Sequence, residues 1–362
     1  MGYFIASDIH SFYTPFIEAL EDSGFDVNNP EHILVIDGDL FDRGSETLEL
    51  YNYVKSLPRE RRVLIRGNHE YLLRNILEKD VPSSYDYSNG TVRTCYDLYL
   101  SKYPNSSFKK KFDEQEKGDS NYLTLLYHMM DNNSIMNIKK FNNSACMIFN
   151  NERSWNQIKK GVRETGIIDW IFSDEWVDYF EMGNYVIVHS FIPYEVPMVK
   201  KWGEYFPADE PKYMPNWREC KLETYWEKAS WGCPYLQFDL GYFDEEIKKG
   251  KILVCGHWHC ADFHLHYEEG IQNDCAIRLS RDDYRVDINE IYFGDNLIAI
   301  DGCTIATGIV NILVIDDKNE KVYNQYKEEL TKELSKSCVI RKYPKIETVT
   351  IRQEDERELE LV

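Results

Sequence analysis

Residues 33–44, ILVIDGDLFDRG, begin as four branched aliphatic side chains and end as an acidic loop with two glycines. A short apolar run bounded by turn-forming residues predicts a buried β-strand at 33–36. The same pattern occurs on either side. A strand predicted at residues 3–6 is followed by Ser7-Asp8-Ile9-His10, and one at residues 62–65 is followed by Arg66-Gly67-Asn68-His69-Glu70. Each of the three strands therefore ends in a polar loop.

Helical segments are expected between these strands. One is predicted at 15–22, with Pro15 in its first turn, and another at 45–56, where Ser45 is a suitable N-cap. Alternating strands and helices predict βαβ units and a parallel sheet, and so an α/β fold. Functional residues in such sheets collect where the strands end and the loops begin.

Two segments interrupt this alternation, and we interpret them as insertions. Residues 82–180 are polar and rich in Asn, Ser, Lys and Tyr, with helix-like stretches near 92–101 and 120–130. Residues 195–245 are rich in Trp, Pro and Tyr and are predicted to be mainly loops. Both leave the sheet beside the polar loops, so we expect them to form a wall or partial lid over that edge.

The remaining strands complete one domain over residues 1–316. They are predicted at 186–188, 252–255, 291–300 and 309–315. Residues 317–362 are expected to form a C-terminal helix, near 323–335, and an acidic tail packed on the domain.

Composition restricts the class of protein. The chain has 362 residues, 43% of them hydrophobic, which supports a folded core rather than disorder. Its formal net charge of −20 disfavours nonspecific nucleic-acid binding, because an acidic protein repels phosphate backbones. We expect no membrane span, because no apolar run approaches about 20 residues. Nine cysteines without a CxxC pair, and an N-terminus unlike a signal peptide, predict a cytoplasmic protein with reduced thiols.

Five strand-end loops carry residue types that bind metals. Each is weak evidence alone, because a single histidine at a strand end usually has a structural role. Together they hold five of the nine histidines of the chain, and they combine carboxylate, amide and imidazole ligands. The loops are Asp8-Ile9-His10, Gly38 to Gly44, Gly67-Asn68-His69-Glu70, His189, and Gly256-His257-Trp258-His259.

This set of ligands suits a pair of metal ions. Two cations about 3.5–4 Å apart can hold both the attacking and the leaving oxygen of a phosphoryl transfer, and a shared carboxylate reduces their repulsion. Mixed oxygen and nitrogen ligands favour Mn, Fe or Zn over Ca. We expect Gly38, Gly44, Gly67 and Gly256 to permit the tight turns that hold such ligands.

The ordered motifs resemble those of the calcineurin-like metallophosphoesterase superfamily. Asp-x-His, Gly-Asp-x-x-Asp-Arg-Gly, Gly-Asn-His-Glu, a strand-end His and Gly-His-x-His follow one another between residues 8 and 259. The Asp-Arg-Gly and Gly-Asn-His-Glu forms are similar to its phosphoprotein phosphatase branch, which includes bacterial Ser/Thr phosphatases and symmetrical dinucleoside tetraphosphatases. The resemblance implies an αββα sandwich and two divalent metal ions, manganese first, with iron, zinc or magnesium as alternatives.

The resemblance also implies a role for each motif residue. Attack on phosphorus would come from a water that bridges the metals. Ligands of the first metal would be Asp8, His10 and Asp39, with His259 as a further ligand; Asp39 would bridge to the second metal, held also by Asn68, His189 and His257. His69 would protonate the leaving oxygen, Asp42 would orient His69, and Arg43 would bind the phosphate, with Asn68 also contacting substrate.

Some residues depart from the branch pattern. Ser190 and Phe191 follow His189 where two glycines are common, and Ala229 to Gly232 contains no second phosphate-binding arginine. Arg66 or Arg218 is a possible substitute. Glu70 is assigned equally to helix capping and to supporting the ligands. Four tryptophans of the second insertion are open to two interpretations, packing or a stacking surface over the cleft: Trp202, Trp217, Trp226 and Trp231.

Several functions remain open. The leading hypothesis is a metal-dependent phosphatase acting on phosphate monoesters of a phosphoprotein or a nucleotide. The alternatives are a dinucleoside polyphosphate pyrophosphohydrolase, an inactive metal-binding scaffold and a nuclease. The filled ligand positions argue against the scaffold, and the acidic charge argues against the nuclease. The oligomeric state is not predicted.

Overall fold

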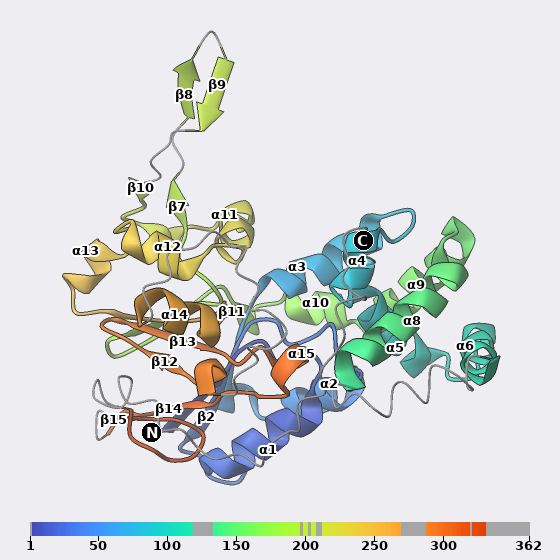
Figure 1. Cartoon of the computed structure of the whole chain (residues 1–362), viewed down its shortest axis with the longest axis horizontal. Helices are drawn as coiled ribbons and strands as arrows, with labels where there is room; N and C mark the ends of the chain where they lie inside the picture. Colours follow the sequence, from blue (N-terminus) through green and yellow to red (C-terminus); the bar gives the residue numbers. More distant parts are fainter. Residues whose placement is uncertain are drawn as a thin grey trace, which may run out of the picture.

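A computed structural model of the chain places two β-sheets face to face with helices on their outer sides (Figure 1). It describes residues 2–118, 133–195, 198–201, 204–207, 212–268, 287–318 and 321–330.

The first sheet has six strands and carries the N-terminal motifs. In order across the sheet they are β15 (Lys321–Tyr323), β14 (Leu313–Asp316), β1 (Gly2–Ala6), β2 (His32–Asp37), β3 (Arg62–Ile65) and β4 (Trp176–Val177). Strands β1 to β4 are parallel, whereas β14 runs antiparallel to β1. The three predicted N-terminal strands and their parallel arrangement are therefore confirmed.

The second sheet has five strands and carries the later motifs. Their order is β12 (Tyr292–Phe293), β13 (Leu297–Asp301), β11 (Ile252–His259), β6 (Tyr185–Ile187) and β5 (Phe180–Met182). The central strand β11 is parallel to both β13 and β6. The strands predicted at 186–188 and 252–255 are present as β6 and β11. The segment predicted as one strand at 291–300 instead forms two antiparallel strands, β12 and β13, and the strand predicted at 309–315 joins the first sheet as β14.

Strand residues alternate between the space separating the sheets and the outer helical layers. Ile5 and Val35 pack between the sheets against Val254 of the second sheet. Their neighbours Phe4 and Leu34 point the other way, into the core beneath the helices. Because side chains of a strand alternate in direction, apolar runs are needed where both faces are covered. The expected αββα sandwich is thus the observed fold.

The first insertion is helical and extends the outer core of the first sheet. Cluster residues from the insertion include Tyr96, Phe112, Phe149 and Trp155. The predicted helix at 92–101 is confirmed as α5, whereas the stretch 120–130 lies outside the described residues. The elements up to the end of the insertion are α1 (Tyr13–Ser23), α2 (Thr47–Ser56), α3 (Asn68–Asn75), α4 (Ser84–Ser88), α5 (Thr91–Lys102), α6 (Ser107–Gly118), α8 (Asn133–Phe149), α9 (Glu152–Thr165), α10 (Ile167–Ile171) and the 3₁₀ turns Arg59–Arg61 and Ile76–Glu78.

The second insertion combines short strands with helices that cover the second sheet. It contains α11 (Glu223–Ala229), α12 (Pro234–Asp239), α13 (Asp244–Ile247), the 3₁₀ turn Trp217–Glu219, and two two-stranded sheets of β7 (Tyr194–Glu195) with β10 (Lys212–Tyr213) and β8 (Met198–Lys201) with β9 (Glu204–Pro207). After β11 follow α14 (Cys260–Tyr267), the 3₁₀ turn Asp287–Asn289 and α15 (Thr304–Thr307).

Two local predictions differ from the structure. Helix α2 begins after Glu46, which occupies the N-cap position, so Ser45 is not the cap. In the C-terminal segment, β15 occupies 321–323 and pairs with β14, and residues 324–330 contain no helix, so the predicted helix does not begin near 323. Strand pairing at the sheet edge has replaced the local helical preference, and residues 331–362 lie outside the described ranges.

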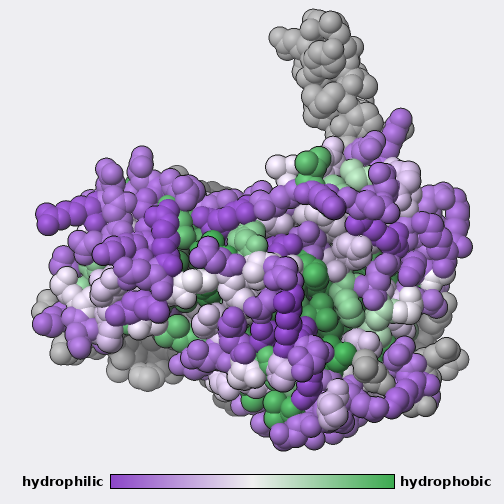
Figure 2. All heavy atoms as spheres, turned by 180° about the vertical axis from the view of Figure 1, so that it is seen from behind, coloured by the Kyte–Doolittle hydropathy of each residue, from purple (hydrophilic) through white to green (hydrophobic). Residues whose placement is uncertain are grey.

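The surface seen from behind is mostly hydrophilic, with hydrophobic side chains in separate patches (Figure 2). Within the described ranges, no helix has the length and apolar character needed to cross a bilayer. None of the seven cysteines in these ranges forms a disulfide.

A charged network fastens the second insertion to the edge strand β5. Glu246 of α13 is fully buried and accepts hydrogen bonds from Arg218 Nη2 at 2.7 Å and Nη1 at 3.1 Å. Arg218 also donates to Glu181 of β5 at 2.6 Å. Burial raises the pKa of Glu246, but its hydrogen bonds with Arg218, Tyr213 and Lys249 outweigh this and hold the pKa well below its usual range.

We expect Arg218→Met to lower the free energy of unfolding by about 3 kcal/mol, because it leaves the buried Glu246 carboxylate without its main partner. Chemical denaturation measures this loss. The control is Arg59→Met, which removes an exposed ion pair with Asp174 and should cost less than about 1 kcal/mol. Similar losses in the two variants would contradict the structural role assigned to Arg218.

Candidate metal centre

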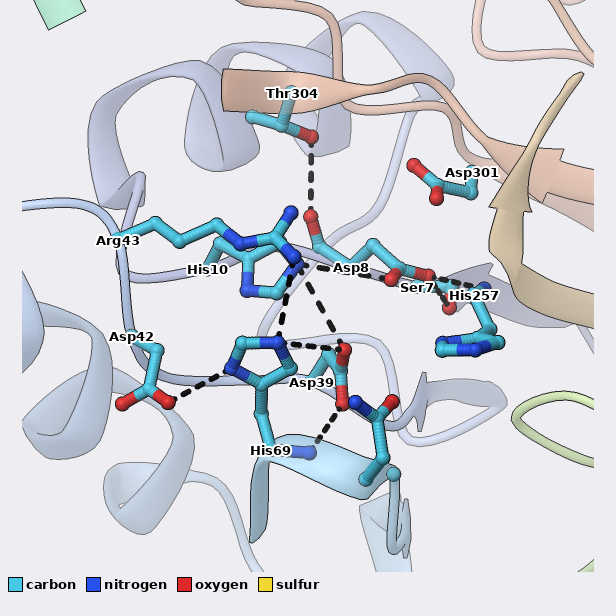
Figure 3. Close-up of polar contacts among 12 residues, drawn as sticks. Ser7, Asp8, His10, Asp39, Asp42, Arg43, His69, His257, Asp301 and Thr304 are labelled. Atoms are coloured by element: carbon cyan, nitrogen blue, oxygen red, sulfur yellow. Dashed lines mark hydrogen bonds and ion pairs between the residues drawn. The ribbon is translucent and has the colours of Figure 1, made fainter. Parts of the chain in front are cut away.

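The polar loops of both sheets meet at one edge of the sandwich. From the first sheet come Asp8 and Asp39, in the loops after β1 and β2, and His69, in the first turn of α3 after β3. From the second sheet come His189, in the loop after β6, and His257, near the end of β11. Figure 3 shows Asp8, Asp39, His69 and His257 around one centre. Direct bonds join the two sets. The backbone N–H of His257 donates to Asp8 Oδ2 at 2.8 Å, and His189 Nδ1 lies 2.9 Å from the carbonyl oxygen of Asp37.

Two groups of side chains in the described part of the chain have their ligand atoms within 4.8 Å of one another. The first contains His10, Asp39 and His69, and the second contains Asp39, His189 and His257. Asp39 belongs to both groups. The structure therefore brings the predicted bridging carboxylate between two sets of metal-binding side chains.

Backbone carbonyls orient two of the imidazoles toward this centre. His10 Nδ1 lies 3.0 Å from the carbonyl oxygen of Phe41, and His189 Nδ1 faces that of Asp37. Because a carbonyl only accepts hydrogen bonds, Nδ1 carries the hydrogen in both rings. In a neutral ring, the lone pair of Nε2 then faces Asp39, which is 3.8 Å from His10 Nε2 and 3.3 Å from His189 Nε2.

Asp8 and Asn68 are placed beside these groups. Asp8 Oδ1 is 3.7 Å from His10 Nε2, and Asn68 Oδ1 is 2.9 Å from His189 Nε2. Asp8, His10, Asp39, Asn68 and His189 are each no more than 2% exposed. A set of oxygen and nitrogen donors so deeply buried suits divalent transition metals.

Burial and neighbouring charges shift the pKa values at the site in different directions, and the carboxylate of Asp39 raises the pKa of His189 against the effect of burial. Burial and then Asp301 raise the pKa of Asp8, whereas His189, His69 and His10 hold the pKa of Asp39 low against the effect of burial. Burial is also the main cause of the low pKa of His10 and His257, which keeps both imidazoles neutral. The neutral imidazole is the form that binds metals.

The backbone is strained at the site. Of the ten non-glycine residues with positive φ in the described ranges, six are predicted site residues, namely Asp8, His10, Asp39, Asp42, Arg43 and His257. Such conformations cost free energy and persist where surrounding structure enforces them. Gly38 alone of the four motif glycines uses positive φ, whereas a Cβ at Gly67 would lie 2.3 Å from Asp39 Oδ1. The expectation that all four serve turn conformations is thus corrected, because close approach is the requirement at Gly67.

Glu70 performs both of the functions that the sequence left open. Its Oε2 accepts from the N–H of Gly67 at 2.7 Å, which caps α3. The same oxygen accepts from the N–H of Asp39, and Oε1 accepts from that of Leu40, both at 3.0 Å. One buried carboxylate therefore fixes the loop after β2 to the loop after β3.

His69, Asp42 and Arg43 form a connected set beside the shared carboxylate. His69 Nδ1 is 2.7 Å from Asp42 Oδ2, which leaves Nε2 directed toward Arg43 Nη2 at 3.4 Å and Asp39 Oδ2 at 3.8 Å (Figure 3). Distance alone allows His69 to act as a proton donor or as a metal ligand. An orienting carboxylate on Nδ1 is consistent with either role.

Several residues around the site were missed by the sequence analysis. Thr91 donates to Asp42 Oδ2 at 2.7 Å, and Thr94 accepts from the N–H of Asp42 at 3.0 Å. Thr304 donates to the carbonyl oxygen of Asp8, and Ser7 Oγ lies 2.5 Å from Asp8 Oδ2. These residues had no recognisable motif: Thr91 is 49 positions from Asp42 and lies in the insertion.

Three candidate residues do not belong to the two ligand groups. His259 is 41% exposed at its side chain, and its ring nitrogens are 3.9 Å from Asp262 and Asp301. Arg66 is paired with Asp178 and lines a small pocket together with His189, whereas Arg218 belongs to the network around Glu246. Both guanidinium groups thus already have carboxylate partners.

We expect Glu70→Gln to weaken metal affinity by about 10–100-fold, the usual effect of losing an outer partner of the ligands. An amide cannot accept from three backbone N–H groups with the same geometry, so the Asp39 loop should shift. Titration with Mn²⁺ followed by calorimetry measures the affinity. Glu78→Gln, an exposed change on the 3₁₀ turn after α3, is the control, and equal affinities in all three proteins would contradict the role of Glu70.

Comparison with known proteins agrees with this geometry. A family model described as calcineurin-like phosphoesterase matches residues 1–261. No curated protein matches the chain.

The solved structures that match the chain include two protein phosphatases and a putative diadenosine tetraphosphatase. Cold-active protein-tyrosine phosphatase of a psychrophile Shewanella species is 12% identical with a TM-score of 0.40, over 91% of this chain and 79% of that one. A Saccharomyces cerevisiae protein serine/threonine phosphatase with similarity to human phosphatase PP5 is 12% identical with a TM-score of 0.41, over 92% and 82%. A putative diadenosine tetraphosphatase is 11% identical with a TM-score of 0.33, over 91% and 94%.

Proposed function

We propose that this chain, which belongs to the calcineurin-like phosphoesterase family, hydrolyses phosphate monoesters at a centre of two divalent metal ions. Membership makes the protein a metal-dependent phosphohydrolase. The observation that supports the proposal is the position of Asp39, whose buried carboxylate belongs to both groups of metal-binding side chains. A single carboxylate between two such groups is what a pair of closely spaced cations requires.

The chemistry of the donors fits the proposed ions. Asp8, His10 and Asp39 would hold the first ion, and Asp39, Asn68, His189 and His257 would hold the second. We leave His259 out of this set, because its ring lies beside Asp301 and Asp262 and is partly exposed. Manganese is the first choice for this mixture of oxygen and nitrogen donors, with iron, zinc or magnesium as alternatives.

When bound, two divalent ions would make a water nucleophilic at neutral pH and reduce the charge on the phosphate. Arg43 would bind the phosphate oxygens through its guanidinium, which suits that geometry. His69 would donate a proton from Nε2 to the leaving oxygen, because Asp42 holds the opposite ring nitrogen at 2.7 Å and balances the charge of the protonated ring. The substrate would be a phosphorylated protein or nucleotide.

Metal analysis and a substrate panel test this proposal. The purified protein, loaded with Mn²⁺, should hydrolyse p-nitrophenyl phosphate, and a chelator should remove both metal and activity. Phosphopeptides, nucleoside monophosphates and dinucleoside polyphosphates then separate the monoester hypothesis from the pyrophosphohydrolase. Cleavage of dinucleoside polyphosphates alone would overturn the monoester assignment.

We expect Asp39→Asn to lower metal occupancy and to abolish turnover, because it removes the negative charge shared by the two groups. Elemental analysis and hydrolysis of p-nitrophenyl phosphate measure the two effects. Asp97→Asn, which changes a largely buried carboxylate of α5 paired with Arg93, is the control and should keep its metal. Full activity with two metals in the Asp39 variant would refute the bridging assignment.

The His69→Asn variant separates the two roles that the geometry allows this residue. A general acid contributes about 10²–10⁴-fold to turnover, and we expect a loss of that size with unchanged metal content. The loss should be smaller for p-nitrophenyl phosphate than for an alkyl phosphate, since p-nitrophenol leaves without protonation. A lower metal content would instead identify His69 as a ligand.

A further inference from the structure

Two exposed aromatic side chains from different insertions face each other beside the metal centre. Tyr85 of α4 is 48% exposed and Trp231, which follows α11, is 40% exposed. Their ring centroids are 6.5 Å apart, with an interplanar angle of 36°. The other tryptophans of the second insertion that the structure describes, Trp217 and Trp226, are buried and pack together. Trp217 and Trp226 are thus packing residues, Trp231 is exposed, and Trp202 lies outside the described residues.

Trp231 is directly adjacent to a proposed metal ligand. Its ring meets that of His257 edge to face, with the centroids 5.8 Å apart and the planes at 90°. The turn that carries Trp231 is hydrogen-bonded to the residues that follow His189 and His257 in the sequence. The carbonyl oxygen of Gly232 accepts from Ser190 Oγ at 2.8 Å and from Trp258 Nε1 at 2.7 Å. The position of Trp231 is therefore fixed relative to the ligands.

Tyr85 is fixed on the other side, next to the phosphate-binding arginine. Helix α4 is followed by Gly90, which packs so closely on Arg43 that an added Cβ would lie 2.2 Å from the Arg43 backbone nitrogen. Asp86 caps the helix through the N–H and hydroxyl of Ser83, both at 2.7 Å. The close packing of Gly90 on Arg43 and the cap of α4 thus hold an exposed tyrosine near Arg43.

A third set of contacts joins the second insertion to the helix that follows β3. Helix α3, which begins with Asn68 and His69, is bound to α11 by Arg74 to Glu223 at 2.5 Å and by Asn75 to Glu227 at 3.1 Å. Helix α11 leads directly into Trp231. Trp231 is therefore held at the surface with part of its ring exposed.

We propose that Tyr85 and Trp231 bind an aromatic ring carried by the phosphorylated substrate, and so select aryl phosphates or nucleotides over aliphatic phosphate esters. This inference rests on the proposed function, because the phosphate of the same substrate would lie at the metal centre. A planar ring contacting both aromatic faces would gain stacking energy that an aliphatic group lacks. Trp231 and Tyr85 are specificity residues here, not catalytic ones.

Binding of substrate analogues tests the proposal without turnover. Calorimetry on the Mn²⁺-loaded protein would compare phenylphosphonate with methylphosphonate, and the non-hydrolysable phosphonate analogue of AMP with that of ribose 5-phosphate. We expect the ring to increase affinity by about 5–30-fold in at least one pair, the value of one stacked ring. A gain in the first pair indicates a ring attached directly to the phosphoryl group, and a gain in the second indicates a base.

Substitutions then assign the gain to the aromatic pair. Trp231→Ala should reduce the affinity ratio to about one, and Trp231→Phe should retain part of it. Leu240→Ala, which removes a 65% exposed side chain of the same insertion, should leave the ratio unchanged. Thermal unfolding verifies that each variant is folded.

The outcomes separate the two proposals. If both members of each pair bind equally well to the unaltered protein, or if Trp231→Ala weakens both members by the same factor, the aromatic selection is wrong and Trp231 only supports His257. If no phosphonate binds the Mn²⁺-loaded protein, the proposed function fails first.

Discussion

The buried carboxylate of Asp39 is the constraint around which the site is built. It lies at the end of a central strand, is 1% exposed and is faced by three imidazoles. A charge in such surroundings is stable only with partners of opposite charge or with a metal. The neighbouring loops must therefore hold their ligands in place before any ion binds, and Glu70 and Gly67 serve this purpose.

The sandwich explains why the site needs both sheets. One sheet provides Asp8, Asp39 and Asn68, and the other provides His189 and His257. Bonds such as that from the His257 backbone to Asp8 cross between the sheets. The apolar layer that joins the sheets thus also determines the distances between the ligands. Any change in sheet packing would alter the centre, so stability and metal binding are coupled in this fold.

The insertions are integrated into the site rather than attached beside it. Thr91 and Thr94 of the first insertion bind Asp42, and the turn after α11 of the second binds the loops of His189 and His257. Loops on a rigid scaffold commonly determine specificity. The proposed chemistry of the centre and the proposed selection of substrate would therefore involve different parts of the chain that share hydrogen bonds.

The sequence by itself determined most of the strands and the candidate ligands, because both are local signals. Four apolar residues before Asp37 predict a buried strand, and a metal-ligand residue type is evident in any context. Tertiary structure decided the rest. The exposure of Trp231 beside His257, the bonds from Thr91 to Asp42, the separation of His259 from the ligand groups and the strand β15 all depend on partners far away in the sequence. Contacts between residues far apart in the sequence leave no periodic pattern in it. Packing between distant segments, rather than local conformational preference, determines where these residues lie.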